Sequence, residues 1–293
     1  MAGCAGGGGE GKVTRRYLIL YLILSVFMCL AGIGKFMMPR AEHVPEFSLY
    51  APDTSDPGTP QEQGLPGMKA ITVKTAAGDM AAWFQPPREK EGKVIIFFPG
   101  NASTLPSEAY IAKFFLPHGY GMYLCTYPGY GLNPGKPSEE ELYENARAGL
   151  RWLQEQGYRP EDVIIFGESL GAGVAVQMAL EFSPKLMVLA SSFTDIPEVM
   201  EYRHKDLPKS RFEKERFDNL KKIRRVKAHL LVVHGELDTL IPITIARKLY
   251  EAANEPKEFM MIKGIDHNDI FLYGAGDMIA DWIDKQTAAA KKR

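Results

Sequence analysis

Short runs of apolar residues alternate with longer amphipathic stretches along most of the chain after residue 68. Uninterrupted apolar runs are typical of parallel strands that are buried on both faces. The longer stretches repeat apolar residues every three or four positions, which is the spacing of a helix with one buried face. Strands that alternate with helices predict a mostly parallel central sheet covered by helices on both faces, an α/β fold. Strands are expected at 70–74, 80–85, 93–98, 122–126, 163–166, 186–189, 230–233 and 258–262.

Turn and capping residues support this division of the chain. Residues 77–79 (Ala-Gly-Asp) can form the turn of a hairpin between the first two strands. Ser138, with Glu141 three positions later, has the pattern of a capping box and predicts the start of a helix there. The last helix is expected to run to about residue 283. Its predicted buried side carries Met278, Ile279, Trp282 and Ile283.

The first 68 residues do not follow the strand and helix pattern. Residues 1–16 form a Gly-rich, polar tail, and the 18 residues that follow it carry no charge. At about 1.5 Å per residue, residues 17–38 can just cross a hydrocarbon core of roughly 30 Å, so they predict a transmembrane anchor. A cleaved signal peptide is the competing interpretation, because small residues lie near the end of the run. Residues 39–68 hold six prolines and are predicted to be a Pro-rich linker to a folded domain at 69–293.

Positive charges around the apolar run indicate how the chain would be oriented. Lys12, Arg15 and Arg16 precede the run, whereas Lys35 and Arg40 follow it. The excess on the N-terminal side favours a cytoplasmic N-terminus. The folded domain would then lie on the periplasmic, lumenal or extracellular side of the membrane.

Charge and cysteine usage exclude several classes of function. A formal net charge of −1 gives no reason to expect a nucleic-acid partner. Cys4, Cys29 and Cys125 lie in the tail, in the apolar run and in a predicted core strand, so no disulfide is expected within the folded domain. No Cys/His cluster has the spacing of a zinc site and no Gly-rich loop resembles a P-loop, so neither a metal nor a cofactor is expected.

A G-x-S-x-G pattern, residues 167–171, stands between a predicted buried strand and an Ala-rich helical stretch. Strand, sharp turn and helix are the context of a nucleophile elbow, in which glycines on either side of the serine permit the strained turn. Ser169 would then be exposed at the tip of the sheet, beside a helix N-terminus that favours negative charge. The alternative interpretation is a plain Gly-Ser turn before a core helix.

A serine hydroxyl needs a base, and the base needs a group that orients it. Both are expected in loops at the carboxyl ends of later strands. Asp238 and His267 follow the seventh and eighth predicted strands, and the order Ser, Asp, His is that of the α/β-hydrolase arrangement. His267 is predicted to be the general base and acid, and Asp238 to orient it. Glu236 and Asp266 are the rivals of Asp238, but the first comes early in its loop and the second adjoins His267.

Two backbone N–H groups are expected to stabilise the oxyanion of a tetrahedral intermediate. One belongs to Leu170, directly after the nucleophile, and the other to Asn101 in the loop after the third strand. His234 is predicted to be a strand-end histidine that bonds to the backbone. Glu168 is predicted to shape the surroundings of the elbow.

Five motifs together resemble the α/β-hydrolase superfamily and, within it, the Bem-like, ABHD-type serine hydrolases, which are often tethered by one N-terminal membrane segment. They are Gly-Glu-Ser-Leu-Gly-Ala-Gly (167–173), Pro-Gly-Asn-Ala (99–102), Tyr-Pro-Gly-Tyr-Gly (127–131), His-Gly-Glu-Leu-Asp (234–238) and Asp-His-Asn-Asp (266–269). The resemblance covers about residues 50–283 and implies Ser169, Asp238 and His267 as a triad. It also implies an acyl ester or thioester substrate near a membrane. The chain departs from many relatives at Pro99, where they have a histidine.

The segment between the sixth and seventh strands, about residues 191–227, is where such folds carry a lid. Residues 203–227 contain 11 Lys or Arg and four Asp or Glu. A basic lid could bind anionic lipid or attract acidic substrates. A solvated helical face is the preferred interpretation, because the acidic residues are interspersed with the basic ones.

The sequence therefore predicts a membrane-anchored serine hydrolase that cleaves carboxylic esters or thioesters through an acyl-enzyme intermediate. Its expected partners are a small-molecule or lipid acyl substrate and, through the N-terminal helix, the membrane. The alternatives are a serine aminopeptidase or amidase with the same triad, and a catalytically silent scaffold on the same fold.

Overall fold

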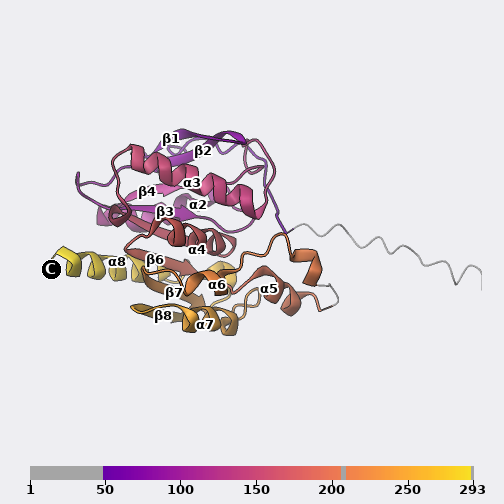
Figure 1. The fold of residues 1–293 in the computed structure, drawn as a ribbon. Coiled ribbons are helices and arrows are strands. Elements are labelled where there is room, and N and C mark those ends of the chain that lie inside the picture. Colours follow the sequence, from indigo (N-terminus) through magenta and orange to yellow (C-terminus); the bar gives the residue numbers. More distant parts are fainter. Residues whose placement is uncertain (1–48, 206–208, 292–293) are drawn as a thin grey trace, which may run out of the picture. The chain divides into compact units, whose positions relative to one another are not determined.

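The computed structural model describes residues 49–205 and 209–291, and this part of the chain is built around an eight-stranded sheet (Figure 1). The strand order is β1-β2-β4-β3-β5-β6-β7-β8. Strand β2 is antiparallel to both of its neighbours, and the strands from β4 to β8 are parallel. All eight predicted strands are present. They are β1 (Lys69–Thr75), β2 (Gly78–Gln85), β3 (Val94–Phe98), β4 (Gly121–Leu124), β5 (Val163–Glu168), β6 (Leu186–Ala190), β7 (His229–Gly235) and β8 (Lys257–Ile262).

Helices connect the parallel strands and cover both faces of the sheet (Figure 1). Helices α2 and α8 contact each other, whereas α4 contacts α3 and α6, and α6 contacts α7. This arrangement is the one that right-handed crossovers between parallel strands produce. The helices are α2 (Leu105–Phe115), α3 (Glu139–Glu155), α4 (Leu170–Phe182), α5 (Ile196–Arg203), α6 (Asn219–Ile223), α7 (Ile243–Ala252) and α8 (Ala275–Lys291).

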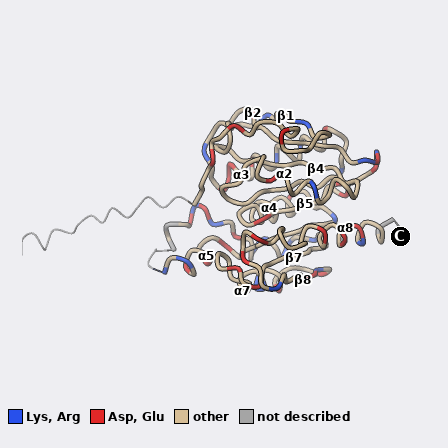
Figure 2. The backbone as a smooth tube through the Cα atoms, turned by 180° about the vertical axis from the view of Figure 1, so that it is seen from behind, with Lys and Arg blue, Asp and Glu red and all other residues tan. Residues whose placement is uncertain are grey.

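The central strands are apolar throughout because both of their faces are covered. In β3, Ile95 and Phe97 belong to one core cluster with Phe115 of α2 and Ile283 of α8. The alternate residues of the same strand point to the opposite face and are also fully buried. Figure 2 shows the charged residues mainly in helices and loops, outside these strands.

The register of the parallel strands brings their carboxyl ends to one edge of the sheet. Phe98 pairs with Gly167, and Glu168 pairs with Ala190. On the other side of β6, Ala190 pairs with Val233. The turn after β5 and the loops after β3, β6, β7 and β8 therefore meet at this edge, which is where ligand sites form in parallel α/β sheets.

The last helix differs from its prediction in two respects. It continues to Lys291, past the expected end at residue 283. The prediction that Met278 is buried is wrong, since this residue is 45% exposed. The buried stripe is centred on Ile279 and Ile283, one turn apart, and Met278 lies about 100° to its side on the helix. Trp282, at the edge of the stripe, is buried and donates from Nε1 to Glu258 Oε1 at 2.7 Å.

In the described part of the chain, no helix has the length and apolarity that a membrane crossing needs. The predicted tail (1–16) and transmembrane anchor (17–38) lie outside the described residues, as does the first part of the Pro-rich segment. From residue 49 onward that segment packs against the domain. Leu65 and Met68 are buried in the core, and Tyr50 is buried as well.

Candidate active site

The turn between β5 and α4 places Ser169 at the carboxyl edge of the sheet. Ser169 has a φ of 50° and a ψ of −118°, a strained conformation for a residue other than glycine. A Cβ atom on Gly167 would lie 2.3 Å from the carbonyl oxygen of Gly171, and one on Gly171 would lie 2.0 Å from that of Phe98. Both positions therefore require glycine. The Ser169 N–H donates to the carbonyl of Ala190 at 3.0 Å, so the turn is also tied to the next strand.

His267 lies directly opposite this serine. Its Nε2 atom is 2.9 Å from Ser169 Oγ, although the two residues are 98 positions apart in the sequence. His267 begins a short 3₁₀ turn (His267–Asp269) after β8, and its side chain is buried. The backbone N–H of His267 donates to the carboxylate of Asp266, which fixes the start of that turn.

Asp238 completes the row of side chains. Its Oδ2 is 2.8 Å from His267 Nδ1, and its Oδ1 accepts hydrogen bonds from the N–H groups of Leu240 and Ile241. Burial by itself would raise the pKa of Asp238. The hydrogen bonds that Asp238 accepts from His234, His267 and the Ile241 N–H outweigh burial and hold this pKa below its ordinary value. An ionised Asp238 favours the tautomer of His267 in which Nδ1 donates and Nε2 accepts.

The two rival carboxylates are directed elsewhere. Asp266 accepts hydrogen bonds from the backbone N–H and hydroxyl of Thr239 and from the N–H of His267, and the two backbone bonds lower its pKa. Glu236 accepts a hydrogen bond from the Gly264 N–H. Both carboxylates connect the loops after β7 and β8. The structure brings Asp238 alone of these three acids to the ring of His267.

Two parts of the chain that were expected to supply oxyanion donors lie next to the serine. Leu170 is the first residue of α4, and the first N–H groups of a helix have no partner within it. The loop after β3 approaches closely as well, since a Cβ on Gly100 would lie 3.5 Å from Ser169 Cβ. The Asn101 side chain points away from the serine. It accepts from the Ala51 N–H at 3.0 Å and donates to the Leu49 carbonyl at 2.7 Å.

Glu108, in the first turn of α2, is a feature of this region that sequence reasoning missed. Its side chain is buried, and burial raises its pKa despite hydrogen bonds from Ser103 and Ser107. Burial, and next the charge of Glu108, raise the pKa of Glu168 beside the nucleophile. The only sequence signal for this pair is an acid among apolar residues at the start of a helix.

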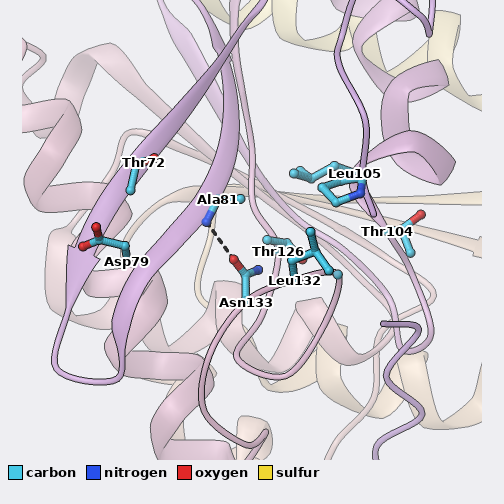
Figure 3. Close-up of a pocket in the computed structure, with 10 residues that line it drawn as sticks. Thr72, Asp79, Ala81, Thr104, Leu105, Thr126, Leu132 and Asn133 are labelled. Carbon is cyan, nitrogen blue, oxygen red and sulfur yellow. Dashed lines mark hydrogen bonds between the residues drawn. The ribbon is translucent and has the colours of Figure 1, made fainter. Parts of the chain in front are cut away.

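A separate cavity of about 230 Å³ lies beside the β1–β2 hairpin (Figure 3). Its walls are formed by the hairpin, the start of α2 and the turn after β4, where Asn133 Oδ1 accepts from the Ala81 N–H at 2.8 Å. Ser169, Asp238 and His267 do not line it. Within residues 49–205 and 209–291, no three His, Cys, Asp or Glu side chains are grouped in a way that could hold a metal ion.

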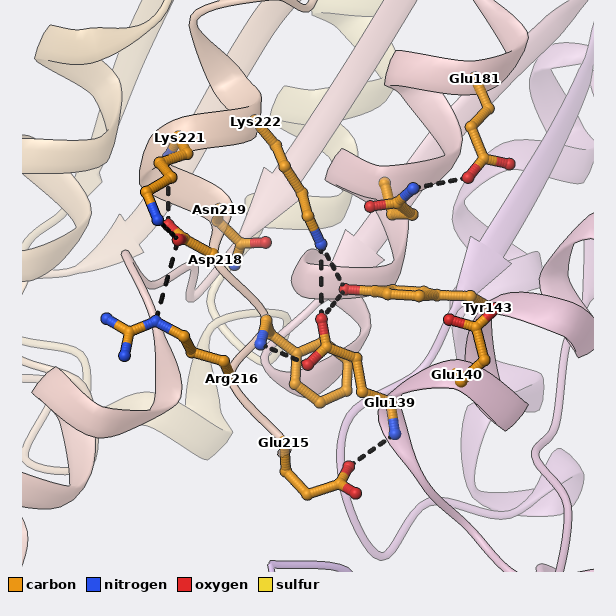
Figure 4. Close-up of polar contacts among 12 residues, drawn as sticks. Glu139, Glu140, Tyr143, Glu181, Glu215, Arg216, Asp218, Asn219, Lys221 and Lys222 are labelled. Atoms are coloured by element: carbon orange, nitrogen blue, oxygen red, sulfur yellow. Dashed lines mark hydrogen bonds and ion pairs between the residues drawn. The ribbon is translucent and has the colours of Figure 1, made fainter. Parts of the chain in front are cut away.

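The insert between β6 and β7 contains the short helices α5 and α6, and a polar cluster joins it to the start of α3 (Figure 4). Glu139 Oε2 accepts from the Phe217 N–H at 2.8 Å, and Glu139 Oε1 accepts from the Tyr143 hydroxyl and from Lys222 Nζ. In the opposite direction, the Glu139 N–H donates to Glu215 at 2.6 Å. The insert is thus held in place by charged side chains.

Comparison with known proteins finds relatives of this chain by sequence. No protein-family model matches the sequence. The chain is 32% identical over 258 residues to the uncharacterized protein Rv2307c of Mycobacterium tuberculosis, across 87% of this chain and 90% of that protein. It is 31% identical over 185 residues to the human alpha/beta hydrolase domain-containing protein 17B, across 61% of this chain and 62% of that protein.

A solved structure supports the same assignment. The esterase Pf2001 of Pyrococcus furiosus superimposes with a TM-score of 0.66 over 82% of this chain and 98% of that one, at 19% identity. An identity this low shows a shared fold. Together with the strand order, the turn at Ser169 and the human relative, these similarities show that the chain belongs to the α/β-hydrolase superfamily.

Proposed function

We propose that this protein is a serine hydrolase that cleaves carboxylic esters or thioesters of an acyl substrate through an acyl-enzyme intermediate. The observation that carries the proposal is one continuous hydrogen-bonded row. Ser169 Oγ lies 2.9 Å from His267 Nε2, and His267 Nδ1 lies 2.8 Å from Asp238 Oδ2. This is the arrangement that lets a serine act as a nucleophile at neutral pH. The human relative is named a hydrolase-domain protein and the structural neighbour from Pyrococcus furiosus is named an esterase, and both names support the same class.

Each side chain of the row has a defined task in this reaction. Ser169 Oγ attacks the acyl carbon while its proton passes to His267 Nε2. Asp238 keeps the ring oriented and stabilises the imidazolium that forms. The backbone N–H groups of Leu170 and Asn101 stabilise the oxyanion, a contribution of about 3 to 4 kcal/mol for a single donor. The proton on Nε2 then goes to the leaving alcohol or thiol, and a water molecule repeats the sequence to release the acid.

The test is hydrolysis of p-nitrophenyl esters and matching thioesters of increasing acyl length by the full chain in detergent. Ser169→Ala should lower turnover by about 10⁶-fold, because it removes the nucleophile from a unit that acts together. Ser55→Ala, an exposed serine outside the site, is the matched control and should leave turnover unchanged. Labelling by a fluorophosphonate should be lost only in Ser169→Ala. Equal rates and equal labelling in the two variants would refute the proposal. Faster hydrolysis of amides than of esters would assign the protein to the amidases instead of the esterases.

We propose in addition that the enzyme is anchored in a membrane and acts on lipid or other acyl substrates near it. This part rests on the uncharged run at residues 17–34. The full chain should sediment with membranes and resist extraction by alkaline carbonate, whereas a chain that begins at residue 49 should remain in the supernatant. Release of the full chain by carbonate would contradict the anchor.

A further inference from the structure

His234 has a second contact that its position at the end of β7 did not predict. The ring is fully buried, and its Nε2 atom lies 2.8 Å from the carbonyl oxygen of Ile241. A carbonyl oxygen can only accept, so Nε2 carries the proton. The same nitrogen lies 3.2 Å from Asp238 Oδ2, and a single N–H is therefore shared between the carbonyl and the carboxylate.

The other ring nitrogen shows that His234 serves as a donor on one side only. Nδ1 of His234 is buried and has no hydrogen-bond partner in the part of the chain that the structure describes. A proton on Nδ1 would be a buried donor without an acceptor, which is costly. His234 is thus a neutral ring whose single N–H is directed at Asp238 and at the turn that follows it.

With this contact, all the acceptor positions of Asp238 are occupied. A carboxylate accepts about four hydrogen bonds, two at each oxygen. Oδ1 of Asp238 accepts from the N–H groups of Leu240 and Ile241 at 3.0 and 2.7 Å. Oδ2 accepts from His267 at 2.8 Å and from His234 at 3.2 Å. The carboxylate cannot rotate without breaking several of these bonds at once.

We infer that His234 is a positioning residue for the proposed reaction, which it serves by holding Asp238 Oδ2 against His267. This inference rests on the proposed function. His234 does not touch the reacting atoms. Its N–H fixes both ends of the turn from Asp238 to Ile241 and takes up part of the negative charge of Oδ2. Without it, Oδ2 interacts with His267 alone, and the buried Ile241 carbonyl loses its donor.

Asp266, which directly precedes His267, does not duplicate this role. Asp266 is bound to the backbone N–H and hydroxyl of Thr239 and to the backbone N–H of His267. Its side chain makes no hydrogen bond to the ring of His267 among the described residues. Among the described side chains, His267 and His234 are therefore the two that hold Asp238 Oδ2 in its orientation.

Three variants of the full chain distinguish the effect of the His234 Nε2–H donor from the effect of the space that the ring fills. His234→Phe keeps a ring without a donor. The amide nitrogen of His234→Gln can occupy the place of Nε2, and that of His234→Asn the place of Nδ1. The measurements are kcat and KM for p-nitrophenyl ester hydrolysis from pH 5 to 9, together with the proton resonance of the His267 Nδ1–H group, which moves as its hydrogen bond to Asp238 changes.

We expect His234→Phe and His234→Asn to lower kcat by about 10- to 100-fold with KM within about threefold, since a displaced catalytic group costs up to about 10²-fold. The acid limb of the pH profile should move to higher pH, because Oδ2 then directs more of its charge to His267. The Nδ1–H resonance should shift in both variants. His234→Gln should restore all three observables, and in an Asp238→Asn background His234→Phe should change kcat by less than about threefold.

Two results would overturn the inference. One is an unchanged Nδ1–H resonance and acid limb in His234→Phe and His234→Asn. The other is equal loss in all three variants, including His234→Gln, which would show that the ring acts only by its shape. The resonance needs no substrate, so it decides the inference even if the wild-type protein hydrolyses no ester and the proposed function fails. Should His234→Phe not fold, the comparison of His234→Gln with His234→Asn gives the same decision.

Discussion

The nucleophile elbow and the insert after β6 both pack against α4, but different forces hold them. At the elbow, Gly167 and Gly171 bring backbone against backbone, with no room for a methyl group. The insert meets the same helix through a side chain, because a Cβ on Gly173 would lie 2.6 Å from the ring of Phe217. Charged contacts also anchor it, among them those of Glu139 with Lys222 and with the Phe217 N–H.

This difference indicates how much each region can change. A backbone contact in a close-packed interior cannot relax without moving a strand or a helix. Side chains can rotate, and ionic contacts respond to pH and salt. The geometry of Ser169 is therefore fixed by sterics, whereas the placement of the insert depends on side chains that a few substitutions can release.

The largest difference is expected when one methyl group is added at either of two positions of α4. Gly171→Ala forces a Cβ against the Phe98 carbonyl and should lower the free energy of unfolding by more than about 3 kcal/mol, or prevent folding. Gly173→Ala displaces the Phe217 ring, and the gain in helix propensity of about 1 kcal/mol offsets part of the cost, so a loss of about 1 kcal/mol is expected. Urea denaturation measures both, and equal losses would contradict the distinction.

The next largest effect should come from the anchor of the insert. Glu139→Ala leaves the Phe217 N–H without its acceptor and removes the carboxylate partner of Lys222, whose Nζ still donates to the Tyr143 hydroxyl. The change should cost about 2 kcal/mol. Hydrogen exchange should quicken in residues 209–223, while the elbow is unaffected. Glu140→Ala is the matched control, because Glu140 lies in the same helical turn but is exposed and pairs with Arg147 at the surface, which is worth less than about 1 kcal/mol. Indistinguishable exchange in the two variants would refute the anchor.

The smallest expected effect concerns the Glu108 carboxylate near the elbow, because its negative charge destabilises the folded state. Burial holds the pKa of Glu108 above its ordinary value in the folded protein, so its ionisation destabilises the fold as the pH rises through and above that ordinary value. Glu108→Gln should therefore be more stable than the wild type by about 1 kcal/mol at pH 8 and equal to it at pH 4. Thermal unfolding at both pH values measures this difference. The exposed Glu155→Gln serves as control, and a gain that is the same at both pH values would contradict the explanation.

Much of the fold follows from local signals in the sequence. Apolar runs identify the central strands β3 to β7, since a strand buried on both faces must be apolar at nearly every position. The pattern at 167–171 predicts the sharp turn directly, because a strand that turns this sharply into a helix needs glycines at these positions. The chain order of Ser169, Asp238 and His267 was sufficient to name the row of side chains that the structure brings together.

Other features were open in the sequence because they depend on where side chains point. Glu236, Asp238 and Asp266 are all carboxylates in the right loops, and only the tertiary structure separates the one on the His267 ring from the two that join the loops. Met278 has the spacing of a core residue but lies beside the buried stripe. The predicted transmembrane anchor lies outside the described residues and stays a prediction.

The strands and the elbow could be predicted because both depend on neighbours along the chain, and the order of the three candidate catalytic residues is read from the chain directly. The tertiary structure decided the rest: the second contact of His234, the buried Glu108, and the pairing of Glu139 with Lys222 across 83 positions. Side-chain direction and burial arise from packing between distant segments. No local pattern of residue types contains that information.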